Sequence, residues 1–142
     1  MRLKNFSILF FFAYVILTSA LDAIAELFKI DAAISLNMAA TIAASFLASA
    51  WFSTARERRP TGQEIAAYAW QATLAAWLAT MIMTAIVLTF LAPKDYAQFM
   101  LASIPRALLI IVVLIAIPLI SLLYYVVIRL SFSWCTKLMR PA

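Results

Sequence analysis

Four long runs of apolar residues constrain the fold of this chain more than any other feature of its sequence. The runs cover about residues 6–27, 33–53, 64–91 and 106–129. Each exceeds the roughly 18 to 20 apolar residues that a helix needs to cross a hydrocarbon core of about 30 Å. With short connections they use up the 142 residues and leave no room for a soluble domain. We therefore expect an all-α polytopic membrane protein whose single domain, residues 1–142, is a four-transmembrane-helix bundle.

The composition argues against several kinds of functional site. The chain has no His, which is the usual proton shuttle and the commonest metal ligand. A single Cys cannot form an internal disulfide or a Cys-pair metal site, and a single Gly cannot form a Gly-rich phosphate loop. We therefore expect no metal, no cofactor and no enzymatic activity. The net charge of +5 lies at the ends of the apolar runs, which indicates membrane topology and not nucleic-acid binding.

The distribution of Lys and Arg predicts how the chain is oriented. One group lies before the first run, between the second and third, and after the fourth: Arg2, Lys4, Arg56, Arg58, Arg59, Arg129, Lys137 and Arg140. The other side holds only Lys29, Lys94 and Arg106. Short loops with an excess of Lys and Arg stay in the cytoplasm, near anionic headgroups. We expect a multi-pass protein of the bacterial inner membrane with both termini cytoplasmic.

Small residues recur at helical spacing in the second and third runs. They are Ala32, Ser35, Ala39 and Ala43, then Ala40, Ala44 and Ala48, and in the third run Ala69, Ala72, Ala76 and Ala79. Faces of this kind let helix backbones approach closely inside a membrane. We therefore expect the second and third helices at the centre of the bundle.

Bulky residues mark the other two runs. The first carries Phe6, Phe10, Phe11, Phe12 and Tyr14, which we expect to face lipid or the cytoplasmic interface. The fourth is rich in Ile, Val and Leu and contains Pro118, which removes a backbone donor and crowds the carbonyl of Leu114. A kink that fits a neighbouring helix is therefore expected near Leu114.

The connection between the second and third runs reads ARERRPTGQE. Thr61 and Glu64 have the spacing of a capping box, in which each side chain bonds a free amide at the start of a helix. Arg56, Arg58 and Arg59 are expected to anchor the loop at anionic headgroups, and a docking site for a cytoplasmic partner is the alternative. Trp51, Phe52, Tyr68 and Trp70 are expected to form an aromatic belt beside it.

This basic Arg-Arg-Pro-Thr-Gly-Gln-Glu segment resembles the corresponding loop of a family of small, uncharacterised bacterial inner-membrane proteins. Proteins of that family are similar in length, have four spans, and carry a basic-Pro-Thr-x-x-Glu segment between the second and third. The resemblance implies the fold and the topology over most of the chain. It carries over no activity and no functional residue.

Two further segments are expected at the membrane surface. The C-terminal residues 131–142 alternate apolar and basic side chains, which indicates an interfacial extension of the fourth helix, with Cys135 an incidental small residue. In the connection after the third run, Asp95 has the position of a cap for a short helix carrying Tyr96 and Phe99.

Acidic residues gather where the first run ends. Asp22 and Glu26 are four residues apart and share a helix face, and Asp31 is expected to cap the second helix. An ionisable group inside the hydrocarbon is costly and marks a functional site by default, although the cost falls near the membrane edge. We expect a polar membrane-edge cluster that joins Asp22, Glu26 and Asn37 to Arg106, with Lys29 close enough to pair with Glu26.

Three classes of function remain open. The first is a non-enzymatic protein that binds a partner within or at the periplasmic face of the bilayer, either an immunity-type protein that neutralises a membrane-acting toxin or an accessory subunit. A homo-oligomer is also compatible with its helix faces. The second is a small proton-coupled exporter that uses Asp22. The third and least supported is an intramembrane hydrolase with two carboxylates as acid and base.

Overall fold

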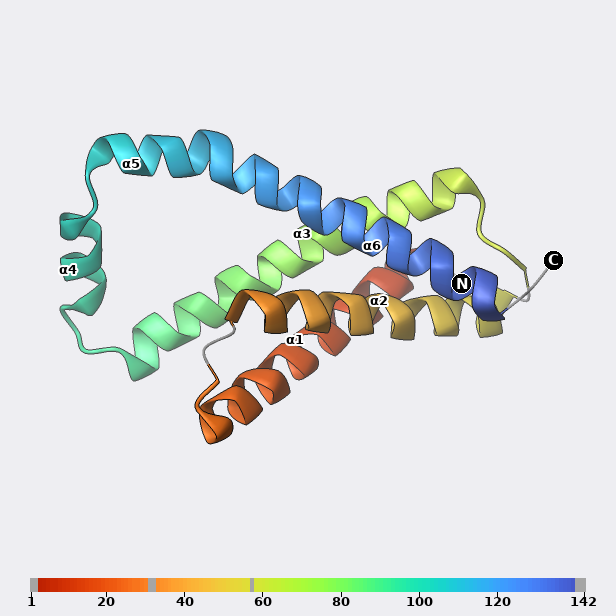
Figure 1. Ribbon diagram of the computed structural model, residues 1–142, viewed down its shortest axis with the longest axis horizontal. Helices are drawn as coiled ribbons and strands as arrows, with labels where there is room; N and C mark the ends of the chain where they lie inside the picture. The colour runs from red at the N-terminus through yellow and green to blue at the C-terminus, as the bar shows by residue number, and fades with distance from the viewer. Residues whose placement is uncertain (1–2, 31–32, 57, 140–142) are drawn as a thin grey trace.

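The protein is an all-α four-helix bundle, and the computed structural model describes residues 3–30, 33–56 and 58–139 (Figure 1). Four of its segments are long and apolar enough to cross a membrane, which confirms the predicted fold class. The helices are α1 (Leu3–Phe28), α2 (Ala33–Arg56), α3 (Gly62–Ile86), α4 (Tyr96–Ser103), α5 (Arg106–Ile111) and α6 (Ile117–Met139). Two π-helical turns, η1 (Val87–Leu91) and η2 (Val112–Ala116), continue α3 and join α5 to α6.

The four spans differ in length. α3 with η1 has 30 residues and α5–η2–α6 has 34 residues, or about 45 and 51 Å at 1.5 Å per residue. α1 and α2 have 26 and 24 residues, or about 39 and 36 Å. The start of α1, the α2–α3 connection and the end of α6 share one end of the molecule, here called the inner end (Figure 1). The two long rods therefore extend past α1 and α2 at the opposite, outer end, where α4 joins them.

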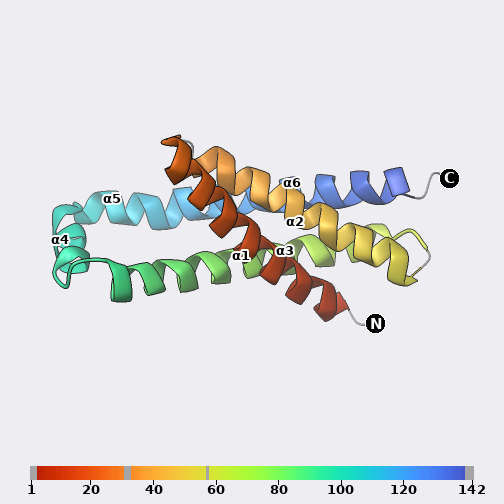
Figure 2. The same cartoon turned by 90° about the horizontal axis from the view of Figure 1, so that it is seen from below.

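The helices pack as a ring in which α1 and α6 each contact both α2 and α3 (Figure 2). The predicted small-residue faces supply these contacts: Ala40, Ala44 and Ala48 of α2 are buried, as are Ala69, Ala72, Ala76 and Ala79 of α3. α2 and α3 therefore occupy opposite corners of the ring and pack mainly on α1 and α6, not on each other. The second predicted face of α2 was wrong, because Ser35 and Ala39 are exposed.

Several hydroxyl groups buried between the helices are satisfied within their own helix. Thr41 Oγ1 donates to the carbonyl of Asn37 at 2.8 Å, and Ser45 Oγ donates to the carbonyl of Thr41 at 2.8 Å. Such bonds remove the need for water, which the hydrocarbon does not supply. Between helices, Ser7 Oγ of α1 donates to Gln71 Oε1 of α3 at 2.8 Å.

An aromatic cluster near the inner end joins all four spans. It consists of Phe6 and Phe10 of α1, Phe52 of α2, Tyr68 of α3 and Phe132 of α6, all buried. The rings of Tyr68 and Phe132 stack with centroids 4.2 Å apart, and those of Phe6 and Phe52 lie 5.2 Å apart. Phe10 meets Tyr68 edge-on at 6.4 Å, and Phe52 meets Phe132 at 5.8 Å. Aromatic pairs at these separations are favourable beyond their buried area.

This cluster corrects two expectations from the sequence. Phe6, Phe10 and Tyr14 face the bundle interior and not the lipid, because their four-residue spacing places them on one side of α1. Phe52 and Tyr68 belong to the same interior and not to an aromatic belt. Of the four predicted belt residues, only Trp51 and Trp70 are exposed.

The fourth span bends just before Pro118. The π-helical turn Val112–Ala116 ends two residues earlier and includes Leu114, the predicted site of the kink. A proline cannot donate to the preceding turn, so a wider turn accommodates the missing bond. Beyond η2, α5 leads away from the rest of the bundle (Figure 1).

Two surface elements differ from what the sequence indicated. α6 runs without a break to Met139, and both Phe132 and Cys135 are buried, so most of the predicted interfacial segment belongs to the bundle. α4 forms at the outer end as expected, but the side chain of Asp95 makes no capping hydrogen bond. Asp31, Ala32, Arg2 and Arg140 lie outside the described residues.

Replacing Phe132 with Ala should lower the free energy of unfolding by about 3 kcal/mol, because it leaves a cavity that borders the rings of Phe52 and Tyr68. Thermal unfolding in detergent micelles measures the loss. Trp134→Ala is the matched control, since Trp134 lies two residues away on the same helix and is exposed. Equal losses from the two variants would contradict the central role of the cluster.

Candidate functional site

The structure brings together two of the four residues in the predicted membrane-edge cluster. Asp22 of α1 and Asn37 of α2 line one cavity of about 160 Å³, together with residues of α3. The complete lining is Tyr14, Val15, Thr18, Asp22, Asn37, Ala79, Thr80, Met83 and Thr84. The polar part of this lining comes from three helices, which is a typical arrangement for a ligand site in a bundle.

Arg106 does not join this cavity. It is the first residue of α5, at the outer end of a long rod, whereas α1 ends well short of that level (Figures 1 and 2). The predicted pairing with Asp22 or Glu26 assumed that all four spans have similar lengths. Because they do not, the start of the fourth span lies beyond the acids of the first.

Glu26 also lies outside the cavity, close to the end of α1. The amide of Lys29 bonds the carbonyl of Glu26 at 3.2 Å, and the amide of Ile30 bonds the carbonyl of Ala25 at 2.9 Å. Lys29 has a left-handed φ of 54°, so this pair of bonds is the Schellman arrangement that ends helices. Among the described residues no ion pair joins the side chains of Lys29 and Glu26.

The face of α1 that lines the cavity is a polar stripe. Tyr14, Thr18 and Asp22 follow one another at four-residue spacing, so they lie on one side of the helix, toward α3. The hydroxyl oxygen of Thr18 is buried and has no hydrogen-bond partner among the described residues. A buried polar atom without a partner is costly, and here it adjoins the cavity.

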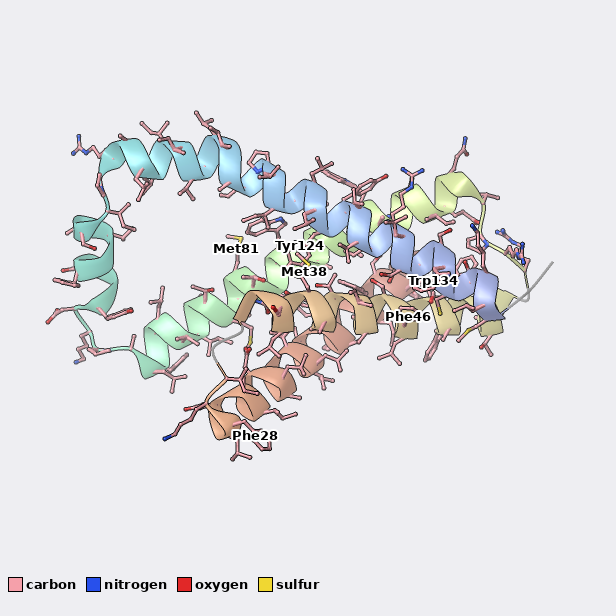
Figure 3. The ribbon with its side chains drawn as sticks, viewed as in Figure 1. Phe28, Met38, Phe46, Met81, Tyr124 and Trp134 are labelled. Carbon is pink, nitrogen blue, oxygen red and sulfur yellow. The ribbon has the colours of Figure 1, made fainter. Side chains whose placement is uncertain are left out.

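A second cavity of about 170 Å³ adjoins the first. Its lining is Asn37, Ala76, Trp77, Thr80, Ile120 and Tyr124, so Asn37 and Thr80 belong to both. Tyr124 lies between α6 and α3 (Figure 3), and its hydroxyl interacts with those of Tyr14 and Thr41. Trp77 Nε1 donates to Ser121 Oγ of α6 at 2.9 Å, which ties the two long rods together beside this cavity.

Beyond Trp77 the two long rods separate. Figure 1 shows the ribbons of α3–η1 and α5–η2 apart along this stretch and joined at their outer ends through α4, and we call this part of the molecule the outer opening. Met81, one turn past Trp77, points into it (Figure 3). Large apolar side chains of both rods are exposed along this stretch: Met81, Ile82, Ile86, Val87, Leu88, Phe90, Leu91, Leu108, Leu109, Ile110, Ile111, Val112, Val113 and Leu114.

The loop between α2 and α3 contains the predicted capping box. Glu64 N donates to Thr61 Oγ1 at 3.3 Å, and Thr61 N donates to Glu64 Oε2 at 2.9 Å. Arg58 donates two hydrogen bonds to the same carboxylate, from Nη2 at 2.6 Å and from Nη1 at 2.9 Å. These hydrogen bonds raise the pKa of Arg58. Arg58 therefore stabilises the start of α3 from inside the loop. Arg56 ends α2, and the backbone carbonyl of Arg59 accepts a hydrogen bond from Arg58 Nη1 at 3.2 Å.

These features define the class of the protein as a polytopic α-helical membrane protein with polar cavities between its spans. No family model, no curated protein and no solved structure matches the chain. Among the described residues, no group of three His, Cys, Asp or Glu side chains is placed to hold a metal ion.

A sequence feature that the predictions above did not include indicates the two cavities together. Trp77, Thr80 and Thr84 are polar or amphipathic residues within two turns of an otherwise apolar run. Read with Asn37, they indicate a polar contact between the second and third spans. Tyr124 gave no comparable signal, because its partners depend on how α6 is rotated against α1 and α2.

Thr61→Ala should lower the free energy of unfolding by about 1 kcal/mol, because it leaves the amide of Glu64 without its capping acceptor. Chemical or thermal unfolding in micelles measures the change. Thr54→Ala is the control, since the Thr54 hydroxyl only bonds the carbonyl of Ala50 on an exposed surface. If Thr54→Ala costs as much as Thr61→Ala, the cap does not stabilise α3.

Proposed function

We propose that this protein is a non-enzymatic protein of the bacterial inner membrane that binds a partner within the bilayer. The observation that carries the proposal is the outer opening, where apolar side chains of both rods are exposed and the described parts of α3–η1 and α5–η2 share no extensive packing contact. In lipid, helices associate by close packing, and an unfilled apolar gap forfeits those contacts. A partner that fills the gap would restore them.

The dimensions of the outer opening favour a single transmembrane helix as its occupant. α4 has eight residues and is about 12 Å long, and it lies across the ends of the two rods (Figure 1). The connecting residues at both ends of α4 widen the separation further. Packed helices lie about 8 to 10 Å apart. The two rods are thus too far apart to touch at this end, whereas one inserted helix would contact both.

Two kinds of partner fit this proposal. In an immunity-type role the inserted helix belongs to a membrane-acting toxin, which is held inactive in the bilayer. In an accessory role it belongs to another subunit of a larger complex. Both roles need only a shaped surface and no chemistry, which accords with a sequence that lacks a recognisable catalytic group.

A small proton-coupled exporter is the second candidate, and the cavity beside Asp22 supports it. The carboxylate of Asp22 lines this cavity together with residues of α2 and α3. A carboxylate in such a position can bind a proton and a cationic substrate alternately. The strong Lys and Arg asymmetry argues against an antiparallel exporter dimer, because such a dimer needs chains inserted in both orientations.

The proposed orientation predicts that a fluorescent protein fused to the C-terminus is fluorescent and that a phosphatase fused there, which works only in the periplasm, is inactive. The excess of Lys and Arg at the inner end is the physical reason. A fluorescent protein and a phosphatase that works only in the periplasm, fused after the C-terminal residue, report the two sides. Phosphatase activity from a substantial share of the molecules would contradict the proposed orientation and revive the exporter.

Partner binding predicts that a photoreactive amino acid at position 81 forms one discrete protein adduct in native membranes. Met81 points into the outer opening (Figure 3), so an inserted helix would lie within reach. Position 16 is the control, because Ile16 is equally exposed but lies on α1, away from the opening. The captured protein is identified, purified and reconstituted with this chain, and Met81→Trp should weaken their binding by about tenfold by filling the gap.

Three outcomes would contradict the partner proposal. They are adducts with lipid only, the same adduct from positions 81 and 16, and an adduct with a second copy of this chain. The last result would show instead that the outer opening is a homo-oligomer interface.

A further inference from the structure

We propose that the two adjoining cavities around Asn37 and Thr80 form a binding site for an amphiphilic primary ammonium compound that reaches it from the bilayer. The two hollows share Asn37 and Thr80, so they form one site between α1, α2, α3 and α6. The inference goes beyond the partner proposal and does not depend on it, because the residues that line the cavities are not those named for the outer opening. It requires binding only, and no export.

The charge of the site selects a cation. Asp22 is the charged residue in the lining, and among the described residues it makes no ion pair. Neither lining includes a Lys or an Arg. A carboxylate near the edge of a membrane, without a protein counter-charge, favours a positively charged ligand over an anionic one.

The hydrogen bonds of Thr80 and Trp77 use up their donors, so the site offers acceptor oxygens to a ligand. Thr80 Oγ1 gives its hydrogen to the carbonyl of Ala76 at 2.9 Å, so toward the cavity it can only accept. Trp77 Nε1 is already bonded to Ser121. The oxygens of Thr18 and Asp22 remain available as acceptors. A primary ammonium group has three N–H donors and can bond several of these oxygens at once.

The remaining walls suit the apolar part of such a ligand. Trp77 and Tyr124 present aromatic rings in the second cavity, and rings of this kind attract cations. Ile120 and Met83 supply aliphatic surface beside them. Volumes of about 170 and 160 Å³ hold an ammonium head and the first few carbons. The rest of an alkyl chain would extend into the lipid.

The test is a titration of the full-length protein in lipid nanodiscs with dodecylammonium below its micelle concentration, followed by calorimetry and corrected with empty nanodiscs. We expect saturable binding that is at least about tenfold weaker in Asp22→Asn, because the ion pair is lost. Glu26→Gln is the matched control: it removes the acid one turn away that lies outside the cavity, and binding should stay within about twofold. Dodecanoate, with the same chain and the opposite charge, should not saturate.

Thr18→Val provides a second variant that keeps the charge. It replaces the buried hydroxyl with a methyl group of the same shape, and dodecylammonium binding should weaken by about threefold. Each variant is checked for its helical content and its elution volume before titration, so that a misfolded protein is not scored as a binding defect. Equal binding by wild type and Asp22→Asn, or saturable binding of dodecanoate, would overturn the proposal. Neither result would bear on adduct formation at position 81.

Discussion

The aromatic cluster at the inner end is the contact on which the rest of the bundle depends. A lipid environment gives helices no hydrophobic reason to associate, so association must come from close packing. The buried alanines of α2 and α3 let the backbones approach, and five rings from four spans fill the space that remains. Because every span contributes to this one cluster, it fixes the rotation of each helix. That rotation then decides which side chains meet farther out.

Because the spans differ in length, the two ends of the bundle differ. With their inner ends held together, the longer rods α3–η1 and α5–η2–α6 must pass the ends of α1 and α2. Among the residues that the structure describes, the bond from Trp77 to Ser121 is the outermost hydrogen bond between them. Past that tie, the π-helical turn before Pro118 directs α5 away, and α4 holds the outer ends apart (Figure 1). The closed inner half and the open outer half follow from the same set of lengths.

The sequence predicted those features that depend on local rules. Span number follows from run length, the cap of α3 from the Thr61–Glu64 spacing, and the buried faces from alanine periodicity. It did not predict the direction of the bulky residues, because Phe10 suits lipid and protein surroundings equally well in composition. It also misplaced Arg106, since pairing across the bundle depends on relative helix lengths, which no single segment encodes.

The two acids near the end of α1, Asp22 and Glu26, have different surroundings because the helices differ in length. Glu26 lies in the last turns of the helix, where the chain reverses at Lys29 and no neighbouring helix encloses the side chain. Asp22, one turn earlier, lies opposite Thr80 and Thr84 on a helix that continues outward. Asp22 can line a cavity near the end of α1 because the longer helix α3 continues past it. Both acids are exposed, but the unequal spans place Asp22 at the rim of a cavity and leave Glu26 outside it.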